Sequence, residues 1–337
     1  MTSHRIGLTG DVMFGRLVDE RQRNRPVTAV WGDMLDRLRR LDGLFVNLEC
    51  CLSTRGQRWS RTYRPFHFRA DPGWAVPALR EAGVDCCALA NNHVLDFERA
   101  ALRDTLSHLD DASIAHAGAG TTREEAFEPT VVSVNDLDIA FASFTDNTPE
   151  YAATDRSPGT AHVEIDVDDE ETRRSVRDTV QRALERDPDL LIASLHWGPN
   201  MVEEPPDSFR EFGRWLIDEG VDLIHGHSAH VFHGIEVYRD RPILYDTGDF
   251  VDDYTVDDRL RNDRSFLFEV SVNAANRPAE LRLTPTEIVD CSVRKAGPKA
   301  AAWARSRMRE LSAPFGTSFE RDGEQLVLEL DARDGDA

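Results

Sequence analysis

Five short apolar runs of this sequence each end in residues that can bind a metal ion or carry a proton. The residues that follow these runs are Asp11 after RIGLTG, Glu49 after LFVNL, Asn91, Asn92 and His93 after CCALA, His196 after LLIASL, and His225 and His227 after VDLI. Apolar runs of this length predict buried strands, and ligands of open α/β sheets bind beyond the carboxyl ends of strands. One polar strand end carries little information, because every strand must end in something polar. Five ends from one chemical set predict a single composite site.

The first part of the chain alternates strands with amphipathic helices. We expect strands at 5–10, 43–49 and 85–90, and helices at 29–41, 72–83 and 98–112. Such alternation predicts βαβ units and a mainly parallel sheet.

The rest of the chain adds a second set of strands. We expect a β-hairpin over 131–145, helices over 169–187 and 209–220, strands over 190–197 and 221–227, and antiparallel strands after residue 234. The pattern predicts an α/β fold in which two sheets pack face to face between helices, a layered α/β/β/α sandwich. Residues 1–290 would form the main domain, and residues 291–337 a small helix-plus-hairpin extension packed on the same core.

The charge balance opposes binding to polyanions. The 61 acidic residues outnumber the 40 basic ones and give a formal net charge of -21, which disfavours electrostatic binding to nucleic acid or anionic membranes. We therefore expect no nucleic-acid partner. Lys295 and Lys299 are the only lysines, and abundant aspartate with so few lysines suggests a halophilic protein. A GC-rich genome that favours arginine is the alternative explanation.

No apolar run approaches the roughly 20 residues that a bilayer-spanning helix needs. The first residues, MTSHRIGLTGD, also lack the apolar region of a signal peptide. Since 40% of the residues are hydrophobic, the composition is that of a globular chain. We expect a soluble, cytoplasmic protein without direct membrane insertion, and its oligomeric state stays open.

Four histidines crowd into HGHSAHVFHG, residues 225–234. Imidazoles combined with carboxylate and amide oxygens suit Mn, Fe, Zn or a mixed pair better than calcium, which prefers an all-oxygen shell. The candidate ligands exceed the four that one tetrahedral zinc takes. We therefore expect two divalent ions bridged by a carboxylate, an arrangement that activates water at neutral pH and holds the reacting oxygens of phosphoryl or acyl transfer.

Five motifs occur in a characteristic order between residues 8 and 250. They are TGDVMFGR, VNLECCLST, ALANNHVLDF, LHWG and HGHSAHVFHGIEVYRDRPILYDTGDF. In this combination they resemble the CapA family of poly-γ-glutamate capsule biosynthesis proteins, which is related to calcineurin-like metallophosphoesterases. The resemblance implies the metallophosphoesterase type of α/β/β/α sandwich and a divalent-metal site.

The resemblance also implies a set of metal ligands. They are Asp11, the bridging carboxylate Glu49, Asn92, His196, His227 and His230. His225 and His233 match no motif of the family, and we expect them to support the site from outside the ligand set.

The same resemblance implies the catalytic role of His93, and the chemistry of other residues suggests roles in support and substrate binding. His93 would protonate the leaving group, and Asp96 would either hold its imidazole in one tautomer or cap the following helix. The expected substrate-binding residues are Arg16, Asn47 and Arg64. Asn47 would also orient the bridging carboxylate, or would equally be an ordinary hydrogen-bonded strand residue. Arg16 would equally form an ordinary salt bridge.

Three departures from the family pattern affect substrate specificity. GHSAH stands where the family usually has GHHPH, DTGDF with Asp249 stands in place of SLGNF, and CCLST follows NLE in place of a threonine-proline stretch. None of these changes removes an expected ligand, so we expect metal binding to persist while the substrate differs.

Two function classes stay open. The first is a metal-dependent hydrolase of the metallophosphoesterase-like type, acting on a phosphoester or on a γ-glutamyl amide of poly-γ-glutamate. The second is a non-catalytic poly-γ-glutamate binding or assembly factor of the capsule, with a structural metal. The basic stretch RGQRWSRTYR, with Arg55, Arg58, Arg61 and Arg64, would line a cleft for such a polyanion or pair with neighbouring carboxylates.

Overall fold

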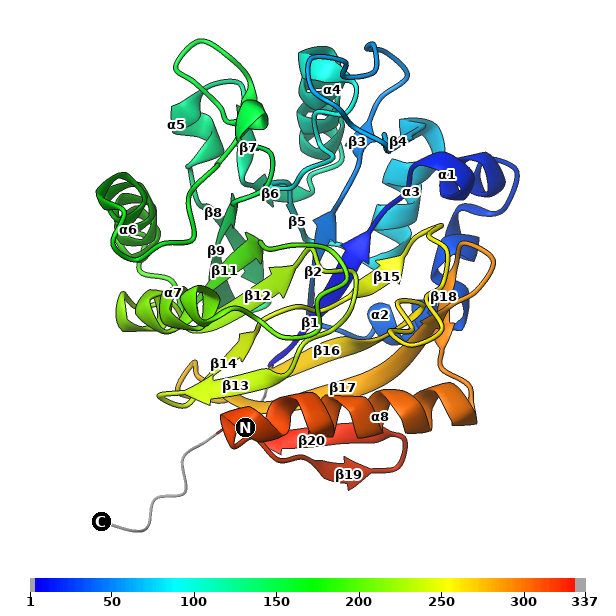
Figure 1. Ribbon diagram of the computed structural model, residues 1–337, viewed down its shortest axis with the longest axis vertical. Coiled ribbons are helices and arrows are strands. Elements are labelled where there is room, and N and C mark those ends of the chain that lie inside the picture. Colours follow the sequence, from blue (N-terminus) through cyan, green and yellow to red (C-terminus); the bar gives the residue numbers. More distant parts are fainter. Residues whose placement is uncertain (1–3, 331–337) are drawn as a thin grey trace.

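A sheet of mixed direction forms one half of the fold (Figure 1). The computed structural model describes residues 4–330. The parallel strands of this sheet are β1 (His4–Val12), β2 (Gly43–Leu48), β5 (Cys86–Ala88), β6 (Ala115–Ala117) and β15 (Asp249–Val251). The antiparallel strands are β16 (Arg264–Val272), β17 (Pro278–Ile288), β18 (Val293–Lys295), β19 (Glu320–Asp322) and β20 (Gln325–Glu329). The strands from the first part of the chain run parallel, as predicted, and strands from the end of the chain complete the sheet in the opposite direction.

The second sheet takes its strands from the middle of the chain. They are β9 (Leu137–Thr145), β11 (Leu190–His196), β12 (Leu223–His227) and β14 (Arg241–Leu244), which run parallel, and the antiparallel edge strands β8 (Thr130–Val134) and β13 (Ile235–Tyr238). In β11, Leu190 and Ile192 enter the core between the sheets, while Leu191 and Ala193 enter the core beneath the helices. Successive side chains of a strand point to opposite faces. Burial of both faces explains why LLIA, residues 190–193, is apolar without interruption.

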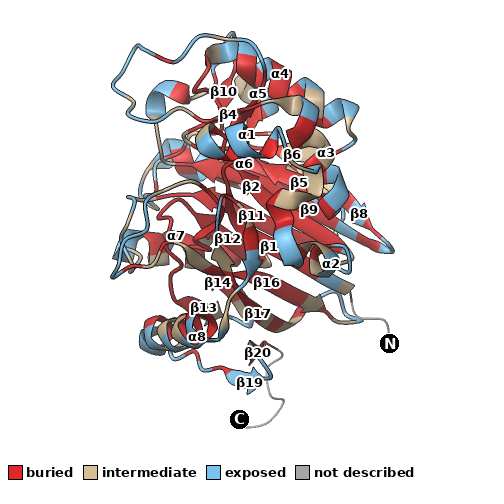
Figure 2. Cartoon of the chain, turned by 90° about the vertical axis from the view of Figure 1, so that its right-hand side faces the viewer, coloured by how far each residue is buried: buried red, intermediate tan, exposed pale blue. Residues whose placement is uncertain are grey.

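The two sheets pack face to face, and helices cover their outer faces. Phe45 of β2 stacks on Phe141 of β9 with ring centroids 5.4 Å apart. The covering helices are α3 (Pro72–Ala82) and α4 (Glu98–Asp111) on the first sheet, and α6 (Glu170–Leu184) and α7 (Asp207–Asp218) on the second. Figure 2 shows buried sheets between helices whose outer faces are exposed. The predicted α/β/β/α sandwich is confirmed.

Short elements connect these layers. They are α1 (Arg16–Gln22), β3 (Cys51–Leu52), β4 (Arg69–Ala70), β7 (Ala119–Gly120), α5 (Arg123–Ala126), β10 (Gly159–Thr160) and the 3-10 turns η2 (Pro149–Tyr151) and η3 (Ala313–Phe315). The residues after 290 extend the first sheet, since β18 and β20 both pair with β17. Helix α8 (Pro298–Ser312) packs Ala304 and Met308 into the core between the sheets. The expected helix and hairpin are present, and the domain boundary at residue 290 stays a prediction.

The predicted helix over 29–41 is wrong in its form. Residues Val27–Met34 make 3-10 turns (η1), and only Leu35–Leu38 are α-helical (α2). Gly32 has φ +47° and ψ -136°, a conformation that glycine adopts readily. A Cβ at this position would lie 2.3 Å from the carbonyl oxygen of Val293. The chain bends at Gly32, and the close backbone of β18 leaves no room for a side chain at this position.

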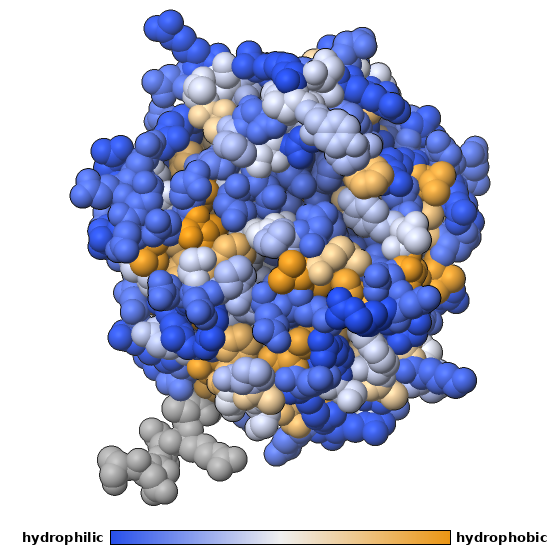
Figure 3. Space-filling view, in the orientation of Figure 1, coloured by the Kyte–Doolittle hydropathy of each residue, from blue (hydrophilic) through white to orange (hydrophobic). Residues whose placement is uncertain are grey.

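The surface is mostly hydrophilic. Figure 3 shows apolar side chains in small separate groups on the face in view. Of the helices that lie within residues 4–330, none is long and apolar enough to cross a membrane.

Candidate metal centre

The carboxyl ends of strands from both sheets meet at one buried edge. In the first sheet, Asp11 of β1 lies in register with Asn47 of β2 and Asp249 of β15. In the second sheet, His196 of β11 lies in register with His227 of β12. The sheets meet here, since Nδ1 of His227 is 3.8 Å from Oδ1 of Asp11. Residues that the strand-end pattern singled out therefore converge.

Two groups of possible ligand atoms share Asp11. One group consists of Asp11, His196 and His227, and the other of Asp11, His230 and Asp249; within each group the atoms lie within 4.8 Å of one another. The Nδ1 atoms of His196 and His227 are 2.8 Å apart. Nδ1 of His230 is 3.4 Å from Oδ2 of Asp11 and 2.8 Å from Oδ1 of Asp249. Metal bonds near 2.1 Å place neighbouring ligand atoms about 3 Å apart, so each group has the dimensions of one ion's ligand set.

Within residues 4–330, several buried polar atoms of the candidate ligands have no hydrogen-bond partner. They are Oδ2 of Asp11, Oε1 of Glu49, Oδ1 of Asn92, Nε2 of His196 and Oδ2 of Asp249. A buried polar atom left unpaired costs about 1–3 kcal/mol. Metal ligation would satisfy these atoms, and a mixture of oxygen and imidazole donors suits Mn, Fe or Zn. The residues present therefore fit divalent metal ions.

Glu49 lies between His93 and His196, and Asn47 holds it there. Oε1 of Glu49 is 3.8 Å from Nε2 of both His93 and His196. The side-chain amide of Asn47 donates hydrogen bonds to Oδ1 of Asp11 at 2.7 Å and to Oε2 of Glu49 at 3.3 Å. Asn47 is completely buried. Its position therefore favours orienting two carboxylates over the direct substrate contact expected from the sequence.

His93 is held in one orientation beside this cluster. Its Nδ1 lies 2.6 Å from Oδ2 of Asp96. The same oxygen accepts the backbone N–H of Phe68 at 2.7 Å, and the hydroxyl of Tyr151 donates to Oδ1 at 3.1 Å. Helix α4 begins after Phe97 without a side-chain cap. Of the two alternatives for Asp96, the structure has the contact with His93 and not the helix cap.

The four histidines of residues 225–234 occupy different positions. His225 and His227 share one face of β12, but His225 lies one step deeper, with Nε2 2.7 Å from the carbonyl oxygen of Thr9. His230 has φ +59°, a left-handed conformation that costs a non-glycine residue about 1 kcal/mol or more. His233 faces a backbone carbonyl oxygen at 2.7 Å. Only His227 and His230 lie near the carboxylates.

Burial and neighbouring charges perturb several of these groups. Burial lowers the pKa of His196 to about 3, and burial together with the His196 imidazole holds the pKa of His227 well below its ordinary value. Both are therefore neutral, as metal ligation requires. Burial acts to raise the pKa of Asp11, but His230 and the other facing imidazoles outweigh it and lower that pKa. Burial and the Asp11 carboxylate raise the pKa of Glu49 well above its usual range. A divalent cation near Glu49 and Asp11 would favour the ionised form of Glu49 and lower this pKa.

Arg16 lies one aromatic layer away from the cluster. Its Nε is 3.3 Å from Oδ2 of Asp253, and its guanidinium packs over the rings of Phe68 and Tyr254 at 5.1 and 5.6 Å. The Phe68 ring in turn contacts the ring of His93, with centroids 4.6 Å apart. Nη1 of Arg16 has no hydrogen-bond partner. The salt bridge is therefore present, and one donor is still free.

The basic stretch of residues 55–64 is largely paired with nearby groups. Its ion pairs are Arg55 with Asp104 and Arg61 with Glu98. Arg64 donates a hydrogen bond to Thr148 and packs over the ring of Tyr151 at 4.7 Å. The predicted pairing with neighbouring carboxylates therefore describes Arg55 and Arg61, whereas Arg64 contacts a hydroxyl group and an aromatic ring.

The family model described as "Bacterial capsule synthesis protein PGA_cap" matches residues 5–254. The match runs from β1 to just beyond β15 and includes every residue of the candidate centre. The chain belongs to this family of capsule synthesis proteins. The resemblance to CapA proteins is confirmed.

Relatives of this CapA-family protein carry names from the same process. A "Probable polyglutamine synthesis accessory protein" of Mycobacterium tuberculosis is 32% identical over 300 residues, which cover 85% of this chain and 77% of that protein. The "PGA biosynthesis protein CapA" of Bacillus subtilis is 24% identical over 327 residues, which cover 96% of this chain and 82% of that protein. A solved 5'-nucleotidase from Candida albicans aligns with 95% of this chain and 61% of its own at 11% identity, with a TM-score of 0.46 that is too low to carry an argument.

The sequence reasoning missed two residues of this CapA-family site. Asp249 stands in the sequence only as a departure from the family pattern, yet it lies against His230. The run PILY just before DTGDF ends in the same polar way as the five other runs, and this signal could have found it. Tyr151, which contacts Asp96, follows no apolar run and leaves no comparable signal.

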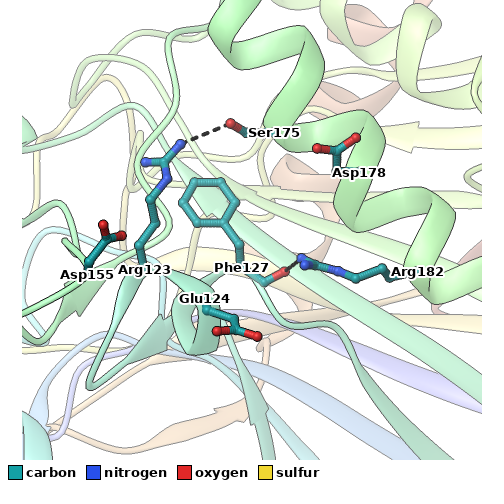
Figure 4. A pocket seen from close by; sticks show the side chains of 7 residues that line it. All are labelled: Arg123, Glu124, Phe127, Asp155, Ser175, Asp178 and Arg182. Carbon is teal, nitrogen blue, oxygen red and sulfur yellow. Dashed lines mark hydrogen bonds between the residues drawn. The ribbon is translucent and has the colours of Figure 1, made fainter.

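A cavity of about 310 Å³ lies apart from the CapA-family site, against α5 and α6 (Figure 4). It is lined by Arg123, Glu124, Phe127, Asp155, Ser175, Asp178 and Arg182. Arg123 donates to the hydroxyl of Ser175 at 3.0 Å, and Arg182 donates to the carbonyl oxygen of Phe127 at 2.7 Å. Both arginines have partners and three carboxylates stand beside them, so we assign this cavity no role.

Proposed function

We propose that this CapA-family protein is a divalent-metal-dependent hydrolase of the metallophosphoesterase-like type. One observation carries the proposal: within residues 4–330, buried atoms of Asp11, Glu49, His196 and Asp249 have no hydrogen-bond partner. These side chains converge from two sheets, directly beside the pair of His93 and Asp96. A purely structural metal would need the ligands, but it would not need an oriented imidazole next to them.

The proposed ligand set would hold two ions of the Mn, Fe or Zn class. It consists of Asp11, Glu49, Asn92, His196, His227 and His230. Bound ions would supply an activated water and neutralise charge on the reacting oxygens. The protein contributes rigidity: the hydroxyl of Ser194 lies 2.8 Å from Nε2 of His227, and Asn47 fixes two carboxylates. Such outer partners orient ligands and strengthen metal binding.

His93 is proposed as the general acid. Because Nδ1 lies 2.6 Å from a carboxylate oxygen of Asp96, Nδ1 carries the proton of that hydrogen bond, and Nε2 is directed toward Glu49 at 3.8 Å. From this position Nε2 would pass a proton to the leaving oxygen or nitrogen. Asp96 and Tyr151 would keep the ring in this orientation.

The proposed substrate is an anion that carries a phosphoester or a γ-glutamyl amide. Arg16 would meet its charged group, since a guanidinium with a free N–H suits an oxyanion. The printed names of the relatives, with their references to polyglutamine and PGA synthesis, support the γ-glutamyl substrate. The kinship of CapA proteins with phosphoesterases supports the phosphoester.

Metal analysis combined with two activity assays tests the proposal. The purified protein is reconstituted with Mn²⁺, Fe²⁺ or Zn²⁺, and its turnover of a chromogenic phosphodiester and of a γ-glutamyl amide is measured. About two equivalents of metal and turnover that is lost in His93→Ala are expected. Metal without turnover of either substrate would favour the alternative, a non-catalytic poly-γ-glutamate binding or assembly factor. Failure to bind metal after reconstitution would exclude the catalytic proposal.

A further inference from the structure

We infer that the two metal positions differ in chemistry. Asp249 is a ligand of the second ion, and the position formed by Asp11, His230 and Asp249 takes a hard divalent cation of the Mn²⁺ class. This inference rests on the two-metal part of the proposed function. It adds a seventh ligand and an ion preference to the six-residue set.

A hydrogen-bonded turn brings Asp249 to Asp11. The carboxylate of Asp246 accepts the backbone N–H groups of Gly248 and Ala229, both at 2.7 Å. Gly248 has φ +64°, which glycine adopts without strain. The turn delivers Asp249 into parallel register with Asp11, and the Asp249 residue is only 1% exposed. Two carboxylates are therefore fixed side by side away from water.

Within residues 4–330, histidines are the only basic side chains that face the carboxylates of Asp11, Glu49 and Asp249. Nδ1 of His230 faces Oδ1 of Asp249 at 2.8 Å and Oδ2 of Asp11 at 3.4 Å, and one N–H cannot satisfy both. Oδ2 of Asp249 has no hydrogen-bond partner. A buried charge without compensation costs several kcal/mol, and a divalent ion among these oxygens would remove that cost.

The donor atoms distinguish the two positions. The group of Asp11, His196 and His227 offers two imidazoles and one carboxylate, whereas the group of Asp11, His230 and Asp249 offers one imidazole and two carboxylates. Imidazole suits Zn and Fe, while carboxylates suit Mg, Ca and Mn. Calcium takes six to eight oxygen ligands. Mn²⁺, which accepts carboxylates together with an imidazole, is the ion expected at Asp249.

A sequential titration tests this assignment without any activity assay. The chelator-treated protein first receives one equivalent of Zn²⁺, and Mn²⁺ is then titrated in while electron paramagnetic resonance measures free Mn²⁺. Wild-type protein is expected to bind one Mn²⁺ beside the Zn²⁺. Asp249→Asn, which has the same shape without the charge, should weaken Mn²⁺ binding at least about tenfold, since loss of an outer partner alone costs 10–100-fold, and should retain the Zn²⁺. His227→Gln should weaken Zn²⁺ binding and leave Mn²⁺ binding unchanged.

The control is Asp222→Asn, the same substitution at a carboxylate that pairs with Arg241 away from the centre; its Mn²⁺ affinity should equal that of the wild type. Circular dichroism checks the fold, and if Asp249→Asn does not fold, the same titration of His230→Gln decides. Equal Mn²⁺ affinity of the wild type and of Asp249→Asn, or of His230→Gln where that variant replaces it, would overturn the inference. The absence of any Mn²⁺ uptake beside Zn²⁺ would also overturn it. A protein that binds Mn²⁺ through Asp249 but hydrolyses neither substrate would keep the inference and lose the proposed activity.

Discussion

Replacing Gly10 by alanine is expected to push apart the two strands that carry Asp11 and Asp249. A Cβ at Gly10 would lie 1.9 Å from the carbonyl oxygen of Gly248, and real Cβ atoms stay beyond 3.0 Å from such atoms. The strands must therefore separate locally by about 1.1 Å, the difference between these two distances. The same carbonyl oxygen accepts the N–H of Asp11 at 2.8 Å, so the backbone cannot relax without moving a ligand.

Two magnitudes follow from this displacement. Overpacking of this kind costs about 1–3 kcal/mol. An unfolding entropy near 2.1 cal/mol/K per residue amounts to about 0.7 kcal/mol/K for this chain, so the Tm should fall by about 1.5–4 °C. Metal ligands must be held within about 0.5 Å of their productive geometry. Zn²⁺ affinity should therefore fall at least about tenfold.

Scanning calorimetry of the chelator-treated protein measures the first effect, and titration calorimetry with Zn²⁺ measures the second. Gly213→Ala in α7 is the matched control, because a Cβ there would meet its nearest neighbour at an ordinary 3.5 Å. This control should leave Zn²⁺ affinity unchanged and raise the Tm by about 1 °C through the lower entropy of the unfolded chain. A Gly10→Ala variant with wild-type Tm and Zn²⁺ affinity would refute the argument that close approach of β1 and β15 builds the centre.

Three further predictions concern single side chains. His93→Gln should abolish turnover and leave the metal content unchanged in elemental analysis; loss of metal would make His93 a ligand instead of an acid. Arg16→Gln should raise KM for an anionic substrate about 10–100-fold, the value of a charged hydrogen bond, with kcat nearly constant; an unchanged KM would remove Arg16 from the binding site. Burial lowers the pKa of His233 to about 4 from the ordinary 6.5, so the folded state resists protonation and stability falls as the pH drops from about 6.5 to about 4. In urea unfolding, the free energy of unfolding of His233→Gln should fall less between pH 6.5 and pH 4 than that of the wild type. If both proteins lose the same free energy over this range, His233 does not cause the pH dependence.

Much of the layered fold could be predicted because burial leaves a direct signature in the sequence. Strands covered on both faces have continuous apolar runs, such as LLIA at 190–193, and helices that cover a sheet carry one apolar face. The failed helix over 29–41 shows the limit of this signature. Its sequence is compatible with a helix, but the chain bends at Gly32, where the backbone lies close to the carbonyl oxygen of Val293. A contact between residues so far apart has no local pattern.

Several sequence-based expectations about the protein in the cell stay predictions. They are the cytoplasmic location, the adaptation to high salt, and the absence of a nucleic-acid partner. The net charge of -21 underlies the expected salt adaptation and the expected absence of a nucleic-acid partner. The expected location does not depend on this charge. A rise in Tm between low and molar KCl would support the salt adaptation, because screening reduces repulsion between surface carboxylates.

For the candidate site, the sequence and the tertiary structure determined different features. The sequence by itself determined which chemical groups end the strands, since buried strands force their polar residues to the sheet edge. Only the tertiary structure decided which of these groups meet. His225 and His227 share a face of one strand, yet a single step along β12 separates a backbone contact from a carboxylate contact. Asp249 reaches Asp11 only because a glycine turn returns the chain beside β1. Contacts across two sheets depend on how distant segments pack, and spacing along the chain does not encode those distances.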